Sequence, residues 1–416
     1  MAIAVVPREK IATICGVAPD NKRAEFAVDG VLPQVVAYPG SAEQVSAVVK
    51  IAAEHKLAVI PRGGGTQMGL GNIPRAVDVV VCTTGLDRIL EYEPADLVVT
   101  VQAGVRLSEL QRKLAERGQF LALDPALAEQ ATIGGIIAAN ASGPLRLRHG
   151  TVRDLLIGIK VVNANGAVTK SGGKVVKNVT GYDMCKLYTG SLGSLGIIVE
   201  ANFKLAPLPR LESTVLAWFA DGAPAYEAAR TIYRSALPIR ACELLSPAAA
   251  DLTGQRGGHL LAVWIGGGEA AVERQNRDVL AMSSSAQRTQ TIAGDELRRL
   301  WRDIEDFGRE RYDAIAKLSS QPSRTGELLS SLPKEATFVS HVLSGVTYVF
   351  GTEAEAATHV ARKLGGYAVL EACPPELKRR LDAWGPVGTD FRLMERIKHE
   401  FDPNSMLNPG RYVGGL

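Results

Sequence analysis

Glycine is concentrated in one short stretch, PRGGGTQMGLG (61–71), directly after an apolar run. Such glycines allow a close backbone approach or a positive φ, and a glycine-rich turn after a strand can bind anionic oxygens through backbone N–H groups. Two common nucleotide loops do not fit, because Met68 stands where a dinucleotide fingerprint from Gly63 needs glycine, and Leu70 where a P-loop needs lysine. We therefore predict a pyrophosphate site of another type, with a ligand-free strand crossing as the alternative.

A second stretch, ATIGGIIAANASG (131–143), contains few bulky side chains. A long groove with little side-chain bulk suits an extended, flat ligand. Together the two stretches favour a dinucleotide cofactor held mainly by backbone, although their chemistry does not say which dinucleotide.

Composition excludes several classes of function. The net charge is +3, from 47 basic and 44 acidic residues, and no basic stripe is interleaved with aromatic residues, which argues against nucleic acid as a partner. The five cysteines are scattered without a C-x-x-C pair, so we expect no metal site, iron–sulfur cluster or disulfide framework within this chain. We find no signal peptide and no transmembrane segment of ~20 apolar residues, and expect a cytoplasmic protein. Peripheral attachment to the inner face of the membrane through partners stays open.

The elements that must position the glycine loops alternate between helices and strands. The sequence predicts a helix over 41–55 capped by Ser41 and Gln44, another from Ser108 and Gln111, and a hairpin over 156–173. Further strands are expected over 57–61, 77–82, 96–104 and 197–205. Prolines at 207 and 209 then suggest a domain boundary, after which strands and helices of roughly ten residues indicate a second α/β or α+β domain.

Four separated motifs resemble those of a known superfamily. They are PRGGGTQMGLG (61–71), TIGGIIAANASG (132–143), GSLGSLGIIVEANFKLAP (190–207) and FDPNSMLNPGR (401–411). In this order they resemble the FAD-binding fold of the vanillyl-alcohol-oxidase and p-cresol-methylhydroxylase superfamily, and more narrowly the flavin subunits related to glycolate oxidase and D-lactate dehydrogenase. The resemblance implies an α+β chain with a two-lobed FAD-binding domain (1–210), an α+β cap domain (211–385) and a C-terminal segment (386–416) that returns to the first domain.

The resemblance also implies a cofactor-binding role for individual residues. The pyrophosphate would be held mostly by the backbone of Pro61, Arg62, Gly63, Gly64, Gly65, Thr66 and Gly69. The flavin groove would be lined by Thr132, Gly134, Gly135, Ala138, Asn140, Ala141, Ser142 and Gly143, with backbone contacts from Ile197 and with Asn408 bringing the C-terminus against the flavin ring. Several relatives attach FAD through a histidine where this chain has Thr66, so we expect non-covalent FAD.

Most residues that bind metal and substrate in catalytic relatives are absent from the corresponding motifs of this chain. Their metal-binding H-x-G-D-G-N-x-H signature has only His341 and Gly345 left in the segment HVLSGVTYV (341–349), so we expect no metal site. A glutamate–histidine stretch before the C-terminal helix is replaced by AWGPVGTD (383–390), and Leu192 replaces another glutamate. No catalytic residue can be assigned; Tyr182, Tyr348, His149 and His341 are candidates for a base, each expected to be structural.

An intact cofactor cradle beside missing metal ligands is similar to the family of FAD-binding E subunits of glycolate oxidases. The resemblance implies a cytoplasmic FAD-dependent oxidoreductase subunit that acts with a second, catalytic FAD-binding subunit and an iron–sulfur subunit on a small 2-hydroxy acid. Two alternatives remain open: a structural or assembly flavoprotein subunit without substrate chemistry of its own, and an independent FAD-linked oxidase of another substrate.

Overall fold

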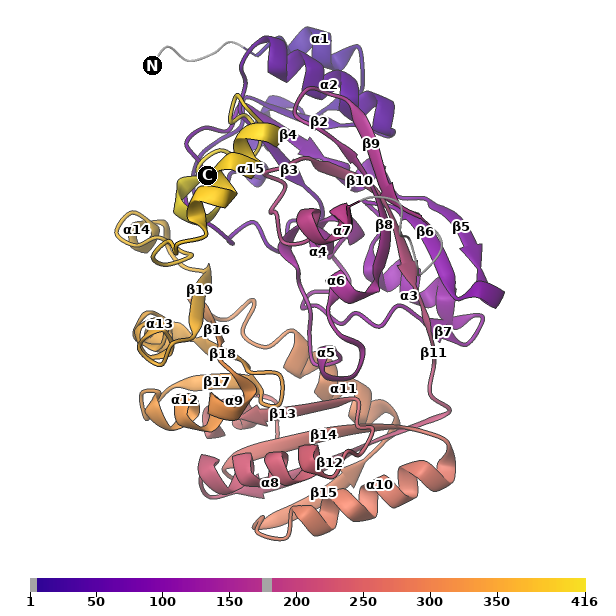
Figure 1. Cartoon of the computed structure of the whole chain (residues 1–416), viewed down its shortest axis with the longest axis vertical. Coiled ribbons are helices and arrows are strands. Elements are labelled where there is room, and N and C mark those ends of the chain that lie inside the picture. Colours follow the sequence, from indigo (N-terminus) through magenta and orange to yellow (C-terminus); the bar gives the residue numbers. More distant parts are fainter. Residues whose placement is uncertain (1–5, 174–181) are drawn as a thin grey trace.

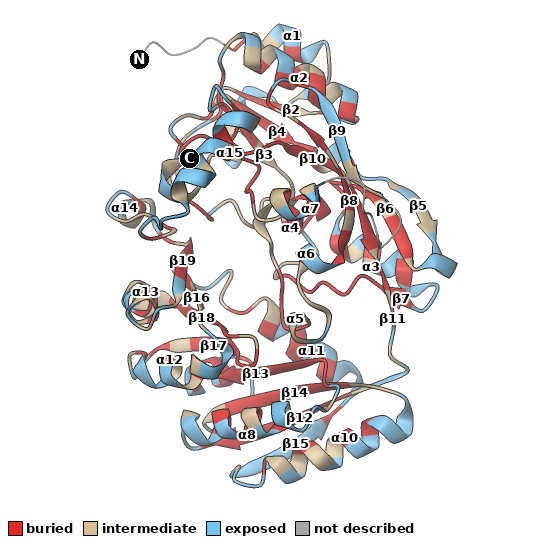
Figure 2. Ribbon diagram, viewed as in Figure 1, coloured by how far each residue is buried: buried red, intermediate tan, exposed pale blue. Residues whose placement is uncertain are grey.

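A computed structural model describes residues 6–173 and 182–416. The chain has an α+β fold with three sheets that matter for function: two in the N-terminal half and one large sheet in the residues that follow (Figure 1). The strands of these sheets are mostly buried, whereas the helices expose one face (Figure 2).

The first sheet is small and largely parallel. Its strands are β1 (Gly16–Val17), β2 (Val35–Tyr38), β4 (Val79–Cys82) and β3 (Val59–Arg62), in this spatial order. Helices α1 (Arg8–Ala12) and α2 (Ala42–Glu54) accompany it. Ser41 caps α2 as predicted, by accepting a hydrogen bond from the Gln44 backbone N–H at 3.2 Å, but the Gln44 side chain reaches the Gly40 N–H instead of closing the box on Ser41. The apolar stripe of α2 is fully buried against the sheet, which fixes β3 and the glycine loop that follows it.

The second sheet is antiparallel. Its strands are β5 (Ile89–Glu93), β6 (Val98–Gln102), β10 (Ile197–Lys204), β8 (Leu156–Val162) and β9 (Val168–Gly172), and β8 and β9 form the predicted hairpin. Around it lie α3 (Leu107–Ala115), α4 (Ile133–Ala139), α5 (Arg146–His149), α6 (Val152–Leu155), α7 (Met184–Tyr188) and the pair β7 (Gln119–Phe120) and β11 (Ala206–Pro207). The predicted cap of α3 is wrong: the helix begins at Leu107, and the Gln111 side chain instead bonds to the backbone of Leu121.

The third sheet has eight strands and forms the cap. Its strands are β15 (Arg288–Ile292), β12 (Leu211–Phe219), β14 (His259–Gly267), β13 (Ala241–Leu245), β17 (Thr337–His341), β18 (Val346–Phe350), β16 (Ile315–Ser319) and β19 (Tyr367–Ala372). Helices α8 (Gly222–Arg234), α10 (Glu269–Met282), α12 (Thr325–Ser331) and α13 (Ala354–Lys363) bury apolar residues against one face. The opposite face carries α9 (Pro247–Leu252) and α11 (Gly294–Glu305) and belongs to the same core as the second sheet of the N-terminal half.

The chain finally returns to the first sheet through α14 (Pro375–Lys378) and α15 (Phe391–Phe401), drawn in yellow in Figure 1. After α15, the Val59 N–H donates to the Met406 carbonyl at 2.8 Å, and Val59 forms a parallel bridge with Leu407. The C-terminal segment therefore lies beside the strand that leads into the glycine loop.

Candidate functional site

The three N-terminal motifs meet in one groove, which we call the cofactor groove. It is lined by Pro61, Arg62, Gly63, Thr83, Gly134, Gly135, Ala138, Gly193, Gly196, Ile197 and Ile198. The end of β3, the turn after β4, the helix α4, the turn before β10 and the start of β10 supply these residues. Segments more than a hundred residues apart in the sequence thus converge, and seven of the residues predicted to bind the cofactor share this groove.

The glycines of the groove are required by protein contacts as well as by any ligand. A Cβ added to Gly63 would lie 2.0 Å from Thr132 Oγ1, and one added to Gly64 would lie 1.8 Å from the Gln130 carbonyl oxygen. Gly193 has φ +70° and packs on Pro61, where a Cβ would lie 2.7 Å from the ring. The glycine loop therefore lies directly against the residues that lead into α4, with no room for a side chain between them.

Unpartnered polar atoms lie on the segments that flank α4 and on the turn before β10. Thr132 Oγ1, Asn140 Oδ1, Ser142 Oγ, Ser191 Oγ and Arg146 Nε are buried, and none has a hydrogen-bond partner among the described residues. Buried polar atoms normally have partners, because leaving them unsatisfied costs free energy. A cofactor rich in phosphate, ribose and flavin oxygens and nitrogens would supply the missing partners, so the residues present fit FAD.

Other predicted residues have protein partners. The Arg62 guanidinium donates to the Glu25 carbonyl at 2.8 Å and stacks over the Phe26 ring at 4.5 Å. It also lies against the glycine loop, because a Cβ on Gly65 would lie 2.8 Å from Arg62 Nη2. Gly65, at φ +83°, continues the loop with Thr66, and a Cβ on Gly69 would lie 3.6 Å from the Glu371 carbonyl oxygen at the end of β19.

Asn408 and the segment 140–143 frame the groove from two sides. Asn408 is buried at φ +51°, donates through Nδ2 to the Leu192 carbonyl and through its N–H to Val59 at 2.8 Å. It therefore ties the C-terminal segment to the turn before β10. Asn140 ends α4 in the left-handed conformation, Ala141 follows it, and a Cβ on Gly143 would lie 2.0 Å from the Asp124 carbonyl oxygen.

A cluster of charged and aromatic side chains lies on the cap sheet face that is shared with the FAD-binding core. We call it the cap-face cluster: Glu243 (β13), His341 (β17), Tyr348 (β18), Lys317 (β16), Glu371 (β19) and Arg309. Neighbouring strands bring these residues together, because Lys317 pairs directly with Tyr348. The register of β16 and β19 shifts at Ile315, which places Glu371 at an irregularity that can redirect a side chain.

The cap-face cluster contains two different ion pairs. Arg309 Nη2 lies 2.9 Å from Glu371 Oε2, Lys317 Nζ lies 3.5 Å from Glu371 Oε1, and both cations lie over the Tyr348 ring. Burial tends to raise the pKa of Glu371, but Arg309 and Lys317 outweigh it and leave this pKa below its ordinary value. Glu371 is therefore ionised, and the triplet carries one excess positive charge.

The second pair joins His341 Nδ1 to Glu243 Oε2 at 2.7 Å. Burial, together with the nearby cations Arg146, Lys317 and Arg309, lowers the pKa of His341 well below its ordinary value. Burial and the Asp124 carboxyl raise the pKa of Glu243 well above its ordinary value. The other ring nitrogen, His341 Nε2, is buried without a hydrogen-bond partner among the described residues.

Arg146 connects the cofactor groove with the cap-face cluster. Its Nη2 donates to the Ser142 carbonyl at 3.3 Å, and its charge acts on both Glu243 and His341. The short helix α5 that carries Arg146 packs on β13, the strand of Glu243. The cap-face cluster therefore lies close to the segment that follows α4, the helix that lines the cofactor groove.

The remaining candidates for a base lie elsewhere. Tyr182 is 93% exposed, and His149 packs edge-on against Phe120, where burial and the charges of Arg240 and Arg148 lower its pKa to about 4. Within the described residues, no three His, Cys, Asp or Glu side chains are grouped to ligate a metal ion. Over the same residues, no helix has the length and apolarity to cross a membrane.

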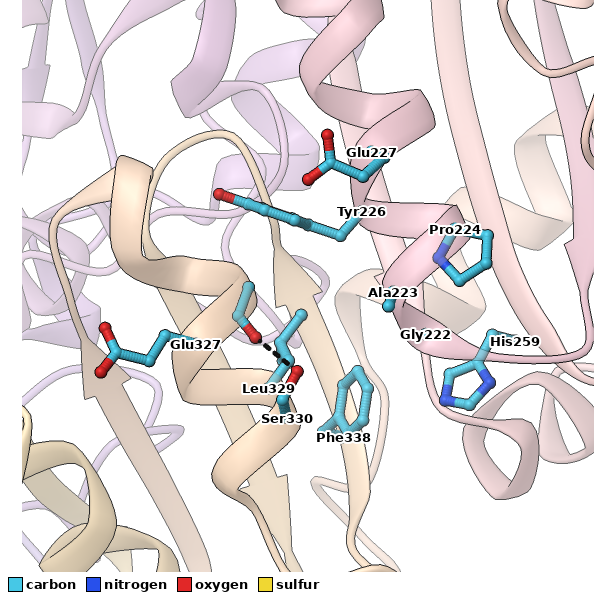
Figure 3. Close-up of a pocket in the computed structure, with 11 residues that line it drawn as sticks. Gly222, Ala223, Pro224, Tyr226, Glu227, His259, Glu327, Leu329, Ser330 and Phe338 are labelled. Carbon is cyan, nitrogen blue, oxygen red and sulfur yellow. Dashed lines mark hydrogen bonds between the residues drawn. The ribbon is translucent and has the colours of Figure 1, made fainter.

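A larger cavity, of about 600 Å³, lies on the helix-covered face of the cap sheet (Figure 3). Tyr226 and Glu227 enter it from α8, Glu327 from α12 and His259 from the start of β14. Its two carboxylates already pair with arginines on their own helices or turns, and the Tyr226 hydroxyl donates to the Pro322 carbonyl at 3.2 Å. This cavity is separated from the cofactor groove by the sheet.

Several site residues were missed from the sequence. Gly193 and Gly196 repeat at a three-residue spacing with Gly190, and this spacing was a usable signal for the turn that lines the groove. Glu243, Arg309, Lys317 and Glu371 gave no such signal, because isolated charged residues in strands and loops become a cluster only through the pairing of distant strands.

Known proteins resemble the chain in both halves. The family described as "FAD binding domain" matches residues 33–172, and "FAD linked oxidases, C-terminal domain" matches residues 383–412. A D-lactate dehydrogenase of Archaeoglobus fulgidus is 30% identical over 411 residues, which cover 92% of each chain. The glycolate oxidase subunit GlcD of Bacillus subtilis is 38% identical over 188 residues, but these span 45% of this chain and only 40% of that relative.

Solved structures agree on the fold. p-Cresol methylhydroxylase with bound substrate superposes with a TM-score of 0.74 over 97% of this chain and 95% of that chain, at 18% identity. At this identity the similarity carries the fold alone. It confirms the expected α+β architecture with a FAD-binding part and a cap.

Proposed function

Because the chain belongs to the FAD-linked oxidases and uses FAD as its cofactor, we propose that it is the FAD-binding subunit of a multisubunit glycolate oxidase or dehydrogenase. The reaction is the two-electron oxidation of a small 2-hydroxy acid to the 2-oxo acid, glycolate to glyoxylate. Relatives named for glycolate, D-lactate and D-2-hydroxyglutarate support the 2-hydroxy acid class. Bound FAD supplies the hydride acceptor, and the protein positions it.

One observation carries this proposal: the segment that follows α4, with its unpartnered polar atoms, lies beside a cap face with excess positive charge. Arg309 and Lys317 share the single carboxylate of Glu371, and Arg146 adds a third cation nearby. An anionic substrate with a carboxylate is the ligand class that such a face attracts. The same cations should bind a neutral alcohol more weakly than an anionic substrate, because an uncharged ligand leaves their excess charge uncompensated.

Electrons need an acceptor outside this chain. All five cysteines are free in the structure, and the four that are buried lie in separate parts of the fold. We therefore propose that a partner carries the iron–sulfur clusters, that a second flavoprotein subunit completes the complex, and that these partners attach it peripherally to the inner face of the membrane. Thr66 in the position of an attachment histidine supports non-covalent FAD.

The independent oxidase of another substrate is the second candidate. It is favoured by the D-lactate dehydrogenase alignment, which spans 92% of both chains. An assembly subunit with an idle flavin is supported less, because a buried, charged cap face beside the groove has a stability cost that such a subunit would not need.

The test is anaerobic reduction of the bound flavin. The purified holoprotein, alone and after co-purification with its natural partners, is mixed with glycolate, D-lactate or D-2-hydroxyglutarate, and the loss of flavin absorbance is followed. Bleaching with glycolate that is much faster in the assembled complex supports the subunit role, whereas full-rate oxidation by the isolated chain supports the independent oxidase. No bleaching with any 2-hydroxy acid in either form would exclude the proposed reaction. Release of the yellow chromophore by acid precipitation checks that FAD is non-covalent.

A further inference from the structure

The reaction proposed above requires a base close to the substrate hydroxyl. Oxidation of a 2-hydroxy acid breaks the C2–H bond, whose hydrogen leaves with two electrons to bound FAD, and the O–H bond, whose proton must go to a nearby group. A new C=O double bond forms from the remaining electron pair. The oxidation therefore needs one group next to the substrate hydroxyl that can accept its proton.

Most charged groups of the cap-face cluster are unsuited to this task. Glu371 is held ionised by Arg309 and Lys317, which lower its pKa and make it a weak base. Lys317 and Arg309 are cations with no free lone pair at neutral pH. Glu243 is only 1% exposed, and its Oε2 faces the His341 ring.

His341 is the exception, because one of its ring nitrogens has a hydrogen-bond partner and the other has none among the described residues. Nδ1 is fixed by Glu243 at 2.7 Å, while Nε2 has no partner among the described residues although the side chain is 94% buried. A buried nitrogen without a partner costs free energy unless a ligand completes it. A carboxylate that orients one imidazole nitrogen while the other faces a reacting group is the arrangement of a general base and its positioning residue.

Resting on the proposed function, we propose that His341 accepts the hydroxyl proton of the 2-hydroxy acid through Nε2, with Glu243 as the positioning residue that holds the ring and compensates the new charge. The pair accepts the proton when it holds one proton in total, as the Glu243 carboxylate and the neutral ring protonated on Nδ1. It becomes a two-proton pair of zero net charge after the transfer.

The surroundings set the pH dependence of this pair. It is faced by the cations Arg146 from α5, Lys317 from β16 and Arg309 from the loop before β16, by the carboxyls of Asp124 and Glu305, and by the Tyr348 ring from β18 at 5.5 Å. The cations favour the one-proton pair, whereas burial favours the pair of zero charge. The rate of flavin reduction should therefore rise with pH as the pair loses its second proton.

The kinetic test compares His341→Gln, Glu243→Gln and the control His259→Gln in the holoprotein. His259 lies on the same sheet but lines the separate cavity of Figure 3. At saturating glycolate or D-lactate, we expect His341→Gln to slow anaerobic flavin reduction at least about 100-fold and to lose the rise with pH. His259→Gln should change the rate less than twofold, and added imidazole should partly restore a His341→Ala variant.

Oxalate binding gives a second readout that needs no turnover. Oxalate carries two neighbouring anionic oxygen groups and so mimics a 2-hydroxy acid that has lost its hydroxyl proton. At a pH where the pair holds one proton, titration calorimetry in buffers of different ionisation enthalpy should show about one proton taken up per oxalate bound by the wild-type holoprotein. His341→Gln should take up none, and Glu243→Gln should take up less than the wild type.

The possible outcomes distinguish a failure of the proposed role of His341 from a failure of the proposed reaction. Should wild-type flavin be reduced while His341→Gln keeps the same rate, pH profile and proton uptake, His341 is not the base and the proposed reaction still stands. Should no 2-hydroxy acid reduce the wild-type flavin, the proposed reaction fails and the base with it. FAD content and thermal unfolding of each variant exclude misfolding, and imidazole rescue identifies a chemical role where the folded fraction falls.

Discussion

The cofactor groove and the cap-face cluster use polar groups in different ways. In the groove the polar atoms belong to backbone and short side chains, and several of them lack protein partners. On the cap face the charged groups belong to long side chains from distant strands, and most of them are paired with each other. The unpartnered polar atoms of the groove thus need a ligand to complete their hydrogen bonds. The charged groups of the cap face are largely paired within the protein, and mainly His341 Nε2 is left to bind a ligand.

This difference predicts that removing one charge on the cap face costs at least as much stability as any single change in the groove. Glu371→Gln leaves Arg309 and Lys317, which are 13% and 22% exposed, without their counter-charge. We expect a loss of about 3 kcal/mol in the free energy of unfolding at pH 7, measured by urea denaturation at equal FAD saturation. The control Glu227→Gln removes an exposed pair with Arg230 and should cost less than about 0.5 kcal/mol.

The same substitution should remove a pH dependence. The folded pKa of Glu371 lies below its ordinary value, so the ion pairs stabilise the protein fully above that value. This contribution is lost as the pH falls through the lower, folded pKa. The stability difference between wild type and Glu371→Gln should therefore shrink on acidification. A difference that stays constant from neutral to acid pH would contradict the assignment of Glu371 as the shared counter-ion.

In the groove, the largest effect should come from a glycine. A Cβ at Gly64 would lie 1.8 Å from a backbone oxygen, so Gly64→Ala must displace the loop or the residues before α4. We expect a loss of about 1 to 3 kcal/mol in stability, together with loss of bound FAD measured from the absorbance ratio of the purified protein.

Gly69→Ala is the matched control in the same loop. Its nearest heavy atom would lie 3.6 Å away, and its φ is not in the left-handed region. It should keep both stability and FAD. Equal losses in the two variants would mean that the loop does not depend on close packing at Gly64.

The glycine requirement also explains how much could be predicted from the sequence. The groove could be located because its constraints are local: a glycine run after β3 and a small-residue stretch before Asn140 are visible without knowledge of the fold. The main elements were also predicted correctly, including α2, the hairpin of β8 and β9, and β10. The helix α4 was missed, since its glycines and alanines carry no clear apolar period.

The cap-face cluster could not be predicted for the opposite reason. Glu243 and His341 are separated by 98 residues, and only the pairing of β13 with β17 brings them to 2.7 Å. His341 was expected to be structural, because its partner was unknown. A side chain whose role depends on a distant strand gives no local signal, so its chemistry follows only from the sheet order.

The smallest predicted effect concerns one hydroxyl in the groove. Ser142 Oγ is buried without a partner among the described residues, and FAD would supply one. Ser142→Ala should weaken FAD binding by about 1 kcal/mol, roughly fivefold in Kd, as measured by titrating apoprotein with FAD and following flavin fluorescence.

Ser283→Ala separates this effect from a general gain or loss of stability. Ser283 Oγ is equally buried and also unpartnered among the described residues, but it lies at the end of α10 in the cap, away from the groove. Removing an unpartnered hydroxyl should leave the apoprotein as stable as before or slightly more so in both variants, because no protein hydrogen bond is lost. Only Ser142→Ala should change the affinity for FAD. If both variants bind FAD like the wild type, the Ser142 hydroxyl is not completed by the cofactor, and the groove depends on its backbone groups alone.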